Sequence, residues 1–536
     1  MNTPDDPSRI VDADALTLAR WIRTRAVSCR EVMHAYLAQI DRCNPAVNAI
    51  VSRVAPETLL AQADACDALL AAGRYLGPLH GFPQAPKDLA AVHDLPTSMG
   101  SPLFAGTRPA ADAIFVERLR RGGAIFVGRT NTPEFGLGGQ TYNAVFGKTR
   151  NAWDTTKTSA GSSGGAAVAL ATRMLPVADG SDMMGSLRTP AAFNHVFGFR
   201  GSRGVIPSGP GPELYLNQFS YDGPMARNVP DLAMLLGVMA GHDPRAPLSL
   251  GQAWEDGHPG AGRPARFATL FAQGSDATAM DLSSRGWRSR GGASGSASDG
   301  APDGRPSGRP RIGWLADLDG HLAVEPEVLA ICRHALGTFR TLGCDVEEIR
   351  AAELAFPLDD IWQSWTTLRS FLIAGNLGAL YQDPGKRALM KPELQWEIAR
   401  GLALSGSDVY AASVRRSAWH QRLRVLFERF DFLVLPAAQV LPFDVDTPWP
   451  REIAGRPMDT YHRWMEAVIP ASLVGAPVIS APAGFSATGL PMGIQIIGAV
   501  GADEDVLRLA HAYDVARGRA DRQRPATADF SGTVPA

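Results

Sequence analysis

Apolar residues recur at helical spacing along the first part of the chain, from about residue 15 to residue 74. They stand three or four positions apart, so that one face of a helix collects them, in LARWIRTRAVSCREVMHAYLAQI and in LLAQADACDALLAAG. The pattern predicts a helical N-terminal segment over residues 1–75 that packs on the main part of the protein.

Beyond residue 75, short apolar runs bounded by turn residues alternate with helical patterns. Such runs are typical of buried strands, and we predict strands at residues 124–127, 175–178, 311–315, 432–435, 478–481 and 493–497. Helices are predicted at residues 113–121 and 166–173, between Pro326 and Gly343, and in a closing segment that Asp503 caps. The alternation predicts an α/β fold in which helices flank a central mixed β-sheet.

One segment, residues 274–310, departs from both patterns. It consists mostly of Gly, Ser, Asp, Arg and Pro, which bury too little apolar surface to offset the entropy lost on ordering. We predict a disordered insertion within a single large domain, because neither flank resembles the start of an independent domain. The motif-bearing core then covers residues 76–273, and the rest of the same domain covers residues 311–536.

Composition and charge narrow the expected partners. The chain is 45% hydrophobic and 20% charged, as in globular proteins with a large core, and its 52 Lys and Arg nearly balance its 54 Asp and Glu. No surplus charge favours nucleic acid or an anionic membrane. We therefore expect a small-molecule substrate and no nucleic-acid or membrane partner, and we leave association into a homo-oligomer open.

The cysteines and the N-terminus indicate a protein of the reducing cytoplasm. Five cysteines, an odd number with no C-x-x-C pair, argue against a disulfide framework or a zinc site. The acidic N-terminus lacks an export signal, and Pro and Gly interrupt the most apolar stretches before they reach the length of a membrane span. No H-E-x-x-H motif or clustered ligand set predicts a metal, and we expect no cofactor.

Two turns rich in serine and glycine lie close together, at residues 158–165 (TSAGSSGG) and 179–188 (DGSDMMGSLR). Small residues let backbone N–H groups approach a ligand, and Ser186 begins a predicted helix, SLRTPAAFN, whose free N–H groups and dipole favour an anion. An oxyanion hole needs this arrangement. Either turn alone is more often a simple helix cap, but the occurrence of both favours a catalytic site.

Other catalytic motifs fit the same region less well. Residues 161–165 match G-x-S-x-G, which would make Ser163 the nucleophile, but that elbow follows a buried strand and the preceding TRNAWDTTKTSA is polar. The phosphate-binding patterns G-x-x-x-x-G-K-[ST] and G-x-G-x-x-G are absent there. His195 has no evident ordered acidic partner, so we expect it in the core or at a helix cap rather than as a base.

The chain resembles the amidase signature family of amide hydrolases. Four segments carry the resemblance in order: GFPQAPKD at 81–88, GRTNTPEF at 128–135, the block 161–198 and GLPMGIQ at 489–495. They span nearly everything outside the insertion, and the separation of 24 positions between Ser162 and Ser186 makes the match specific. The resemblance implies the amidase signature fold and hydrolysis of a carboxylic amide through a seryl acyl-enzyme.

The resemblance also implies a Ser-cisSer-Lys triad. In this triad Ser186 is the nucleophile, Ser162 follows a cis peptide bond and relays the proton, and Lys87 is the terminal base. A lysine acts as a base only when neutral, and burial favours the neutral amine. Lys87 lies in the otherwise apolar FPQAPKDLAAV, whereas without the resemblance a surface lysine paired with Asp88 would be the simpler interpretation.

An oxyanion hole belongs to the same pattern. The resemblance assigns it to the backbone N–H groups of Met183, Met184 and Gly185. Supporting roles at the turn are expected for Ser163, Asp182 and Arg188. The family usually has glycine at position 184 and often at 160, where this chain has methionine and alanine. We predict a negative φ at Met184, because residues other than glycine rarely adopt a positive one.

Two other functions compete with amide hydrolysis. One is that of a glutamyl-tRNA amidotransferase A-type subunit, which releases ammonia from glutamine and needs a partner subunit. The other is that of a catalytically silent family member, an alternative that remains because Met184 replaces the usual glycine. The motifs do not name the substrate, which could also be a carbamate or an ester. Aromatic residues favour an aromatic or apolar acyl group, although core packing explains them equally well: Trp362, Trp365, Phe371, Trp449 and Trp464.

Overall fold

The computed structural model describes residues 7–251, 267, 270–271, 308–518 and 523–529. Its centre is an eight-stranded sheet whose strands, from one edge to the other, are β11 (Asp345–Glu348), β10 (Arg311–Trp314), β12 (Phe432–Pro436), β16 (Pro491–Gly498), β15 (Val478–Phe485), β8 (Phe197–Arg200), β9 (Tyr221–Ala226) and β7 (Ala178–Asp182). β11, β10 and β12 are mutually parallel, and the other neighbours are antiparallel. The predicted mixed sheet is confirmed.

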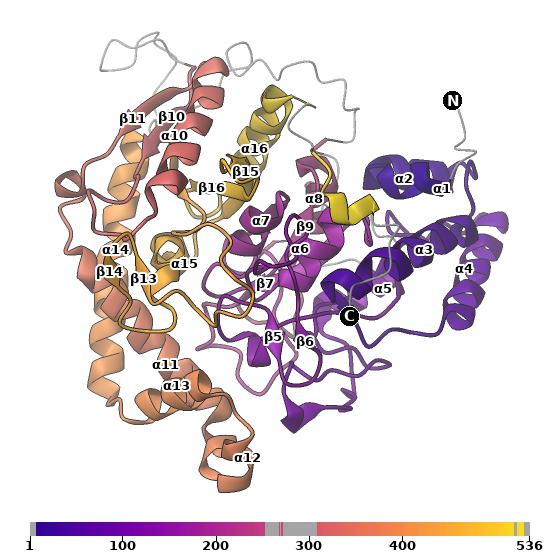
Figure 1. The fold of residues 1–536 in the computed structure, drawn as a ribbon, viewed down its shortest axis with the longest axis horizontal. Helices are drawn as coiled ribbons and strands as arrows, with labels where there is room; N and C mark the ends of the chain where they lie inside the picture. The colour runs from indigo at the N-terminus through magenta and orange to yellow at the C-terminus, as the bar shows by residue number, and fades with distance from the viewer. Residues whose placement is uncertain (1–6, 252–266, 268–269, 272–307, 519–522, 530–536) are drawn as a thin grey trace.

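The N-terminal segment forms the predicted helical layer. Its helices are α1 (Pro7–Asp12), α2 (Ala15–Arg23), α3 (Cys29–Val47) and α4 (Pro56–Ala71). Figure 1 shows them gathered on the side of the molecule opposite to β10 and β11. A capping box fixes the start of α3, because the Ser28 side chain accepts from the N–H of Glu31 and the Glu31 carboxylate accepts from the N–H of Ser28.

Further helices lie around the sheet or pack on another helix away from it (Figure 1). They are α5 (Ile114–Arg121), α6 (Gly164–Ala171), α7 (Arg188–Asn194), α8 (Val229–Met239), α10 (Pro326–Thr341), α11 (Leu358–Gln382), α12 (Pro384–Ala388), α13 (Pro392–Leu402), α14 (Gly406–Arg429), α15 (Ile469–Val474) and α16 (Asp503–Arg517). α11 packs against both α13 and α14, and α12 and α13 pack on α11 away from the sheet. None of the helices in the described part of the chain is both long enough and apolar enough to cross a membrane.

Short ladders and 3-10 turns complete the fold. Two-stranded ladders pair β1 (Ile50–Val51) with β4 (Arg129–Thr130), β2 (Pro83–Gln84) with β3 (Ile125–Phe126), β5 (Tyr142–Asn143) with β6 (Gly147–Lys148), and β13 (Glu452–Ile453) with β14 (Arg456–Pro457). The 3-10 turns are η1 (Pro102–Phe104), η2 (Glu134–Gly136), η3 (Ala351–Leu354), η4 (Arg463–Val468) and η6 (Ala526–Asp529).

Helices cover both faces of the central sheet. Gly493 and Gly498 lie five positions apart in β16 and therefore on opposite faces. A side chain at Gly493 would meet Ala192 of α7, and a side chain at Gly498 would meet Val506 of α16. β12 and β16 are buried along their whole length, as expected for strands enclosed on two sides.

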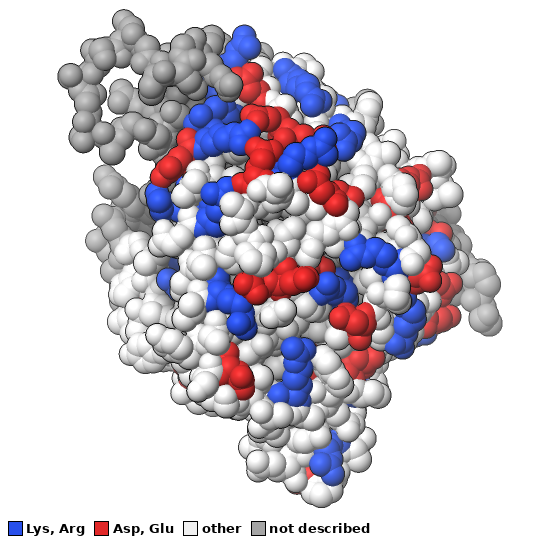
Figure 2. Space-filling view, turned by 90° about the vertical axis from the view of Figure 1, so that its left-hand side faces the viewer, with Lys and Arg blue, Asp and Glu red and all other residues white. Residues whose placement is uncertain are grey.

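Charges of both signs alternate on the face formed around β11, α10 and α14, as Figure 2 shows. Arg429 pairs there with Glu347 and with Glu353, and Arg333 pairs with Glu348. These are exposed pairs, which contribute little to stability individually. Their alternation agrees with the near balance of charge in the sequence.

The structure moves two predicted strands. The strand expected at 175–178 is β7, which begins at 178 and continues through Asp182, so the sequence DGSD is an edge strand rather than a turn. Its residues are small and polar, so a search for apolar runs does not find it. Glycine is needed at position 180, because a side chain there would come within 2.6 Å of Oγ of Ser163. The strand expected at 124–127 is β3, which pairs with β2 outside the central sheet.

Two helix starts also differ from expectation. α7 begins at Arg188 rather than at Ser186, because the chain still turns at Gly185, whose φ is 82°. Asp503 is the first residue of α16 and not its cap, and its carboxylate accepts from the N–H and the hydroxyl of Ser202. The insertion predicted at 274–310 lies, apart from its last three residues, outside the described residues.

Candidate active site

Lys87 is buried at the centre of the candidate site. It follows β2 on a loop, and only 1% of its surface is exposed. Its N–H donates to Oδ2 of Asp179 at 3.0 Å, and its carbonyl accepts from Nη2 of Arg129 at 2.8 Å. The alternative of a surface lysine paired with Asp88 is wrong, because Lys87 is enclosed and the buried Asp88 carboxylate accepts from the N–H and the hydroxyl of Ser98.

The amine of Lys87 lies among three serine hydroxyls. Nζ donates to Oγ of Ser162 at 2.8 Å, to Oγ of Ser163 at 2.9 Å and to Oγ of Ser181 at 3.0 Å. Ser162 and Ser163 stand just before α6, and Ser181 lies in β7. The lysine, the first serine-glycine turn and the edge strand of the sheet therefore meet at one point.

Burial is the main influence on the pKa of this amine. It lowers the pKa of Lys87 to about 7, although the carboxyl groups of Asp222, Asp182 and Asp179 act in the opposite direction. An amine with a pKa near 7 is partly neutral at neutral pH, and only the neutral amine accepts a proton. Lys87 therefore meets the electrostatic requirement for a general base.

The first serine-glycine turn brings Ser162 to Lys87. The Gly161–Ser162 peptide bond is cis, as the resemblance implies. Oγ of Ser163 accepts from the N–H of Ser181 and donates to its carbonyl, at 3.2 Å in each case, which ties the turn to β7. The start of α6 requires glycine at position 165, since a side chain there would come within 2.4 Å of the backbone nitrogen of Asn131.

Ser186 lies on the second turn, between β7 and α7, with 8% of its surface exposed. Its carbonyl accepts from the N–H of Ser163 at 3.1 Å, so the two turns are in direct contact. Among the described residues no hydrogen bond engages its hydroxyl. The structure thus gathers Ser186, Ser162 and Lys87 into one cluster, although Lys87 and Ser186 are 99 positions apart in the sequence.

Asp182 and Arg188 shape the second turn. Oδ1 of Asp182 accepts from the N–H of Gly185 at 2.8 Å, and Oδ2 accepts from the N–H of Leu187 at 3.1 Å and from Nε of Arg188 at 2.9 Å. Burial by itself would raise the pKa of Asp182, but Arg188 and these hydrogen bonds hold it well below its usual range. Arg188 also donates to Oε1 of Gln495 at 2.7 Å, which anchors α7 to β16.

The backbone N–H groups of this turn differ in whether they have a hydrogen-bond partner. The N–H of Gly185 is taken by Asp182, whereas those of Met183, Met184 and Ser186 have no partner among the described residues. Met184 does not occupy the positive-φ region, as predicted, and Gly185 supplies the left-handed position, with a φ of 82°. The methionine in place of the usual glycine is therefore accommodated without backbone strain.

The two methionine side chains contact α11. Sδ of Met184 accepts from Nε1 of Trp365 at 3.3 Å, and Sδ of Met183 accepts from Nη1 of Arg369 at 3.1 Å. Arg369 is itself held by the buried carboxylate of Glu397 and by the hydroxyl of Tyr461. Sequence motifs could not reveal Arg369, because the contact joins residues 186 positions apart.

The other aromatic residues that we singled out have packing contacts elsewhere. The ring centroids of Trp362 and His462 are 5.1 Å apart. The ring of Trp464 lies against Gly139, and the guanidinium of Arg451 lies over the ring of Trp449. Phe371 packs against the main hydrophobic core. In the described part of the chain, Trp365 is the one of these five that contacts the second turn, through Sδ of Met184.

His195 occupies the C-terminal end of α7. It has a φ of 57° at the helix cap, and its ring stacks on Phe485 with centroids 4.5 Å apart and meets the edge of Trp153. The expectation of a core or capping residue is therefore confirmed.

The described residues contain one group with metal-ligand geometry, formed by His93, Asp94 and Asp112. The two carboxylates both accept from Arg120, and His93 and Asp94 are exposed. A cationic guanidinium within the group opposes a metal cation, so these residues form a surface ion-pair cluster.

Comparison with known proteins identifies the family. The family model for amidases matches residues 31–282 and 294–507. The chain is 32% identical to an acylamidase of Rhodococcus erythropolis, over 95% of this chain and 96% of that protein. It is also 32% identical to the glutamyl-tRNA(Gln) amidotransferase A-type subunit of Acidothermus cellulolyticus, over 95% of each chain.

A solved structure agrees with these matches. A bacterial aryl acylamidase of the amidase signature family superposes with a TM-score of 0.81 at 26% identity, over 98% of this chain and 99% of that one. The family match covers both serine-glycine turns and Lys87 as well as the sheet that carries them. The chain therefore belongs to the amidase signature family and is an amide hydrolase.

Proposed function

We propose that this protein hydrolyses a carboxylic amide with Ser186 as nucleophile, Ser162 as proton relay and Lys87 as base. The observation that carries the proposal is the 2.8 Å hydrogen bond between Nζ of Lys87 and Oγ of Ser162 in a buried site. The contact between the backbone of Ser186 and that of Ser163 adds support, because it holds the nucleophile beside the relay.

The residues suggest the following sequence of steps. Neutral Lys87 takes the proton of Ser162, Ser162 takes the proton of Ser186, and the Ser186 oxygen attacks the amide carbon. The ammonium of Lys87 then returns the proton through Ser162 to the leaving amine, and the carbon–nitrogen bond breaks. Water, activated by the same groups, hydrolyses the resulting acyl-enzyme and restores the hydroxyl.

The negative oxygen of the tetrahedral intermediate needs nearby donors. We assign it to the N–H groups of the turn that Met183, Met184 and Gly185 form. The N–H groups of Met183 and Met184 are the primary donors, because Gly185 shares its N–H with Asp182. Ser163, Asp182 and Arg188 keep the turn in shape through the contacts described above.

The side chains beside the turn favour an apolar acyl group. Met184 is 3% exposed and Trp365 is 1% exposed, and they contact each other next to Ser186. Apolar walls bind apolar substituents by excluding water. We therefore expect small neutral amides with an aromatic or aliphatic acyl group to be the best substrates.

A second candidate follows from the curated relatives, in which an amidotransferase A-type subunit and an acylamidase stand at the same identity. In that case the same triad would release ammonia from glutamine in the presence of a partner subunit. The two candidates differ in what the purified chain does alone. Hydrolysis of simple amides by the isolated chain supports the amidase, and activity on glutamine that requires a partner supports the transferase.

Reaction with a fluorophosphonate tests both candidates against a catalytically silent scaffold. The reagent phosphonylates an activated serine, so peptide mapping should place the adduct on Ser186. Heat-denatured protein is the control. A chain that takes no label and cleaves no amide would overturn the proposed function.

A further inference from the structure

The edge strand β7 and its neighbour β9 place the carboxyl group of Asp222 near the amine of Lys87. β7 and β9 pair in a register that sets Ser181 opposite Asp222. The N–H and the carbonyl of Ser181 bond to the Ser163 hydroxyl on the outer side of β7, so Ser181 and Asp222 form a non-hydrogen-bonded pair. In such pairs the facing side chains lie on the same face and close together.

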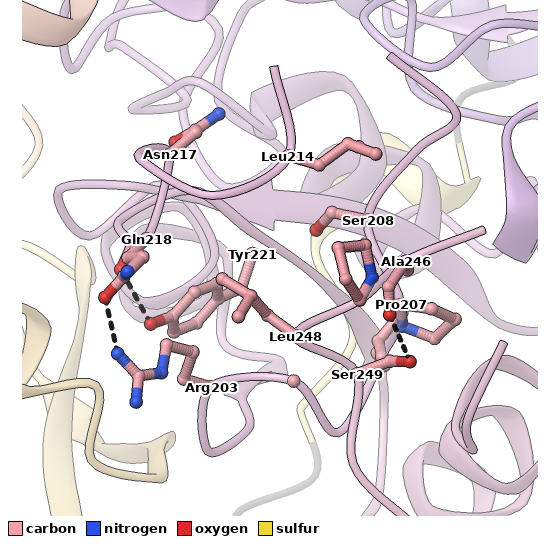
Figure 3. Close-up of a pocket in the computed structure, with 13 residues that line it drawn as sticks. Arg203, Pro207, Ser208, Leu214, Asn217, Gln218, Tyr221, Ala246, Leu248 and Ser249 are labelled. Carbon is pink, nitrogen blue, oxygen red and sulfur yellow. Dashed lines mark hydrogen bonds between the residues drawn. The ribbon is translucent and has the colours of Figure 1, made fainter. Parts of the chain in front are cut away.

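The neighbouring residue confirms the direction of the Asp222 side chain. Tyr221 lines a cavity of about 40 Å³ together with Arg203 and Leu248, and Figure 3 shows its ring among these residues. Successive side chains in a strand point to opposite faces. Asp222 therefore points away from this cavity, toward the face where Oγ of Ser181 lies 3.0 Å from Nζ of Lys87.

The other charged groups around Lys87 are already engaged. Asp179 accepts from the N–H of Lys87, Asp182 is paired with Arg188 and with Arg200, and Arg129 lies beside Asp88. The carboxylate of Asp222, in contrast, makes no hydrogen bond or ion pair with any other described residue. It is half-buried, so its charge is only partly screened by water.

We propose that Asp222 is a positioning residue for Lys87: its carboxylate, placed across the Ser181 hydroxyl from Nζ, stabilises the ammonium that forms when Lys87 takes the proton. This inference rests on the proposed role of Lys87 as base. It gives Asp222 a task like that of the aspartate in a Ser-His-Asp triad, which stabilises the cation formed during acylation.

The protonation behaviour of the two groups agrees with this geometry. Burial is the main cause that raises the pKa of Asp222 to about 7; Asp179 acts in the same direction and Lys87 opposes it. Asp222 is in turn the leading influence that favours the charged form of Lys87. Groups that interact in this way titrate as a pair. The acid limb of the pH profile of kcat/KM should therefore reflect the joint titration of Lys87 and Asp222. It should move when the Asp222 carboxylate is removed.

The test compares the pH profiles of kcat/KM on a simple amide for the wild type, Asp222→Asn and Asp222→Glu. Without the carboxylate the ammonium is less stable, so the limb of Asp222→Asn should move to lower pH by about one unit. Its plateau should fall by up to about tenfold, since one unit of basicity corresponds to a factor of ten. Asp222→Glu keeps the charge and should restore the wild-type limb.

Two further variants keep the test decisive. Asp345→Asn, on the opposite edge strand β11, removes the same charge far from Lys87 and should leave the limb unchanged. Asp222→Ser is a second neutral variant if Asp222→Asn does not fold, and it should show the same displaced limb. An unchanged limb in the folded neutral variants overturns the role of Asp222.

Failure of this inference can be told from failure of the proposed function. If Lys87→Ala abolishes turnover while the Asp222 variants keep the wild-type profile, Lys87 is the base and Asp222 plays no part. If Lys87→Ala retains the wild-type profile, the proposed function itself is wrong, and the inference falls with it.

Discussion

Nζ of Lys87 lies 2.8 Å from Oγ of Ser162, although 75 positions separate the two residues in the chain. The loop after β2 supplies the amine, and the turn before α6 supplies the hydroxyl. In the proposed mechanism this contact lets the hydroxyl of Ser162 pass a proton to buried Lys87.

Substitution of the relay should slow acylation sharply. Ser162→Ala removes the hydroxyl between Ser186 and Lys87, and we expect kcat/KM to fall by at least about a thousandfold, the scale of triad deletions. Pre-steady-state release of the amine product measures the acylation step. A rate within about tenfold of the wild type would reduce Ser162 to a structural turn residue.

The base should produce a defined pH dependence. The pKa of Lys87 is lowered to about 7, and the protonated amine cannot accept a proton, so kcat/KM should rise with pH up to about 7 and then level off. Lys87→Ala should lose nearly all activity and flatten whatever remains. Substantial turnover by Lys87→Ala throughout the neutral and mildly alkaline range would contradict the assignment.

Met184 should limit the size of the acyl group. Its side chain contacts Trp365 beside the catalytic turn, so Met184→Gly should raise kcat/KM for bulkier acyl amides relative to acetyl amides. Because Met184 does not have a positive φ, glycine relieves no strain and should cost more than the about 0.5–1 kcal/mol of added backbone freedom, since a buried side chain is removed as well. A higher melting temperature with unchanged acyl preference would contradict both parts.

The hairpin between β13 and β14 offers a test of the backbone geometry away from the site. Ala454 and Gly455 form its two-residue turn with φ of 50° and 80°, a conformation that favours Asn-Gly. Ala454 is exposed, so Ala454→Asn should raise the free energy of unfolding in urea by about 0.5 kcal/mol. Ala105→Asn, at an exposed position with φ of −54°, is the control and should show no gain.

The residues of the proposed triad could be singled out from the sequence because each of them stands in a local motif. The resemblance placed Lys87, Ser162 and Ser186, and the structure brings the three together. The sequence places β7 three residues too early, because strands are recognised by apolar or alternating runs and DGSD is small and polar.

Contacts between residues far apart in the chain could not be predicted from the sequence. Asp222 faces Ser181 only through the register of the edge strand β7 with its neighbour β9, and Arg369 reaches Met183 from a helix far along the chain. Neither residue stands in a motif, and a lone charge in a sequence is more often on the surface. Only the pairing of strands and helices reveals such neighbours.

Intact mass spectrometry of the acyl-enzyme tests the central claim most directly. The purified chain, quenched in acid during turnover of an activated amide or ester, should carry one acyl group, and peptide mapping should place it on Ser186. Ser186→Ala, folded as judged by circular dichroism, should carry none and should show no turnover. Acylation at another residue, or amide hydrolysis by Ser186→Ala at a rate close to the wild type, would contradict the assignment of Ser186 as the nucleophile.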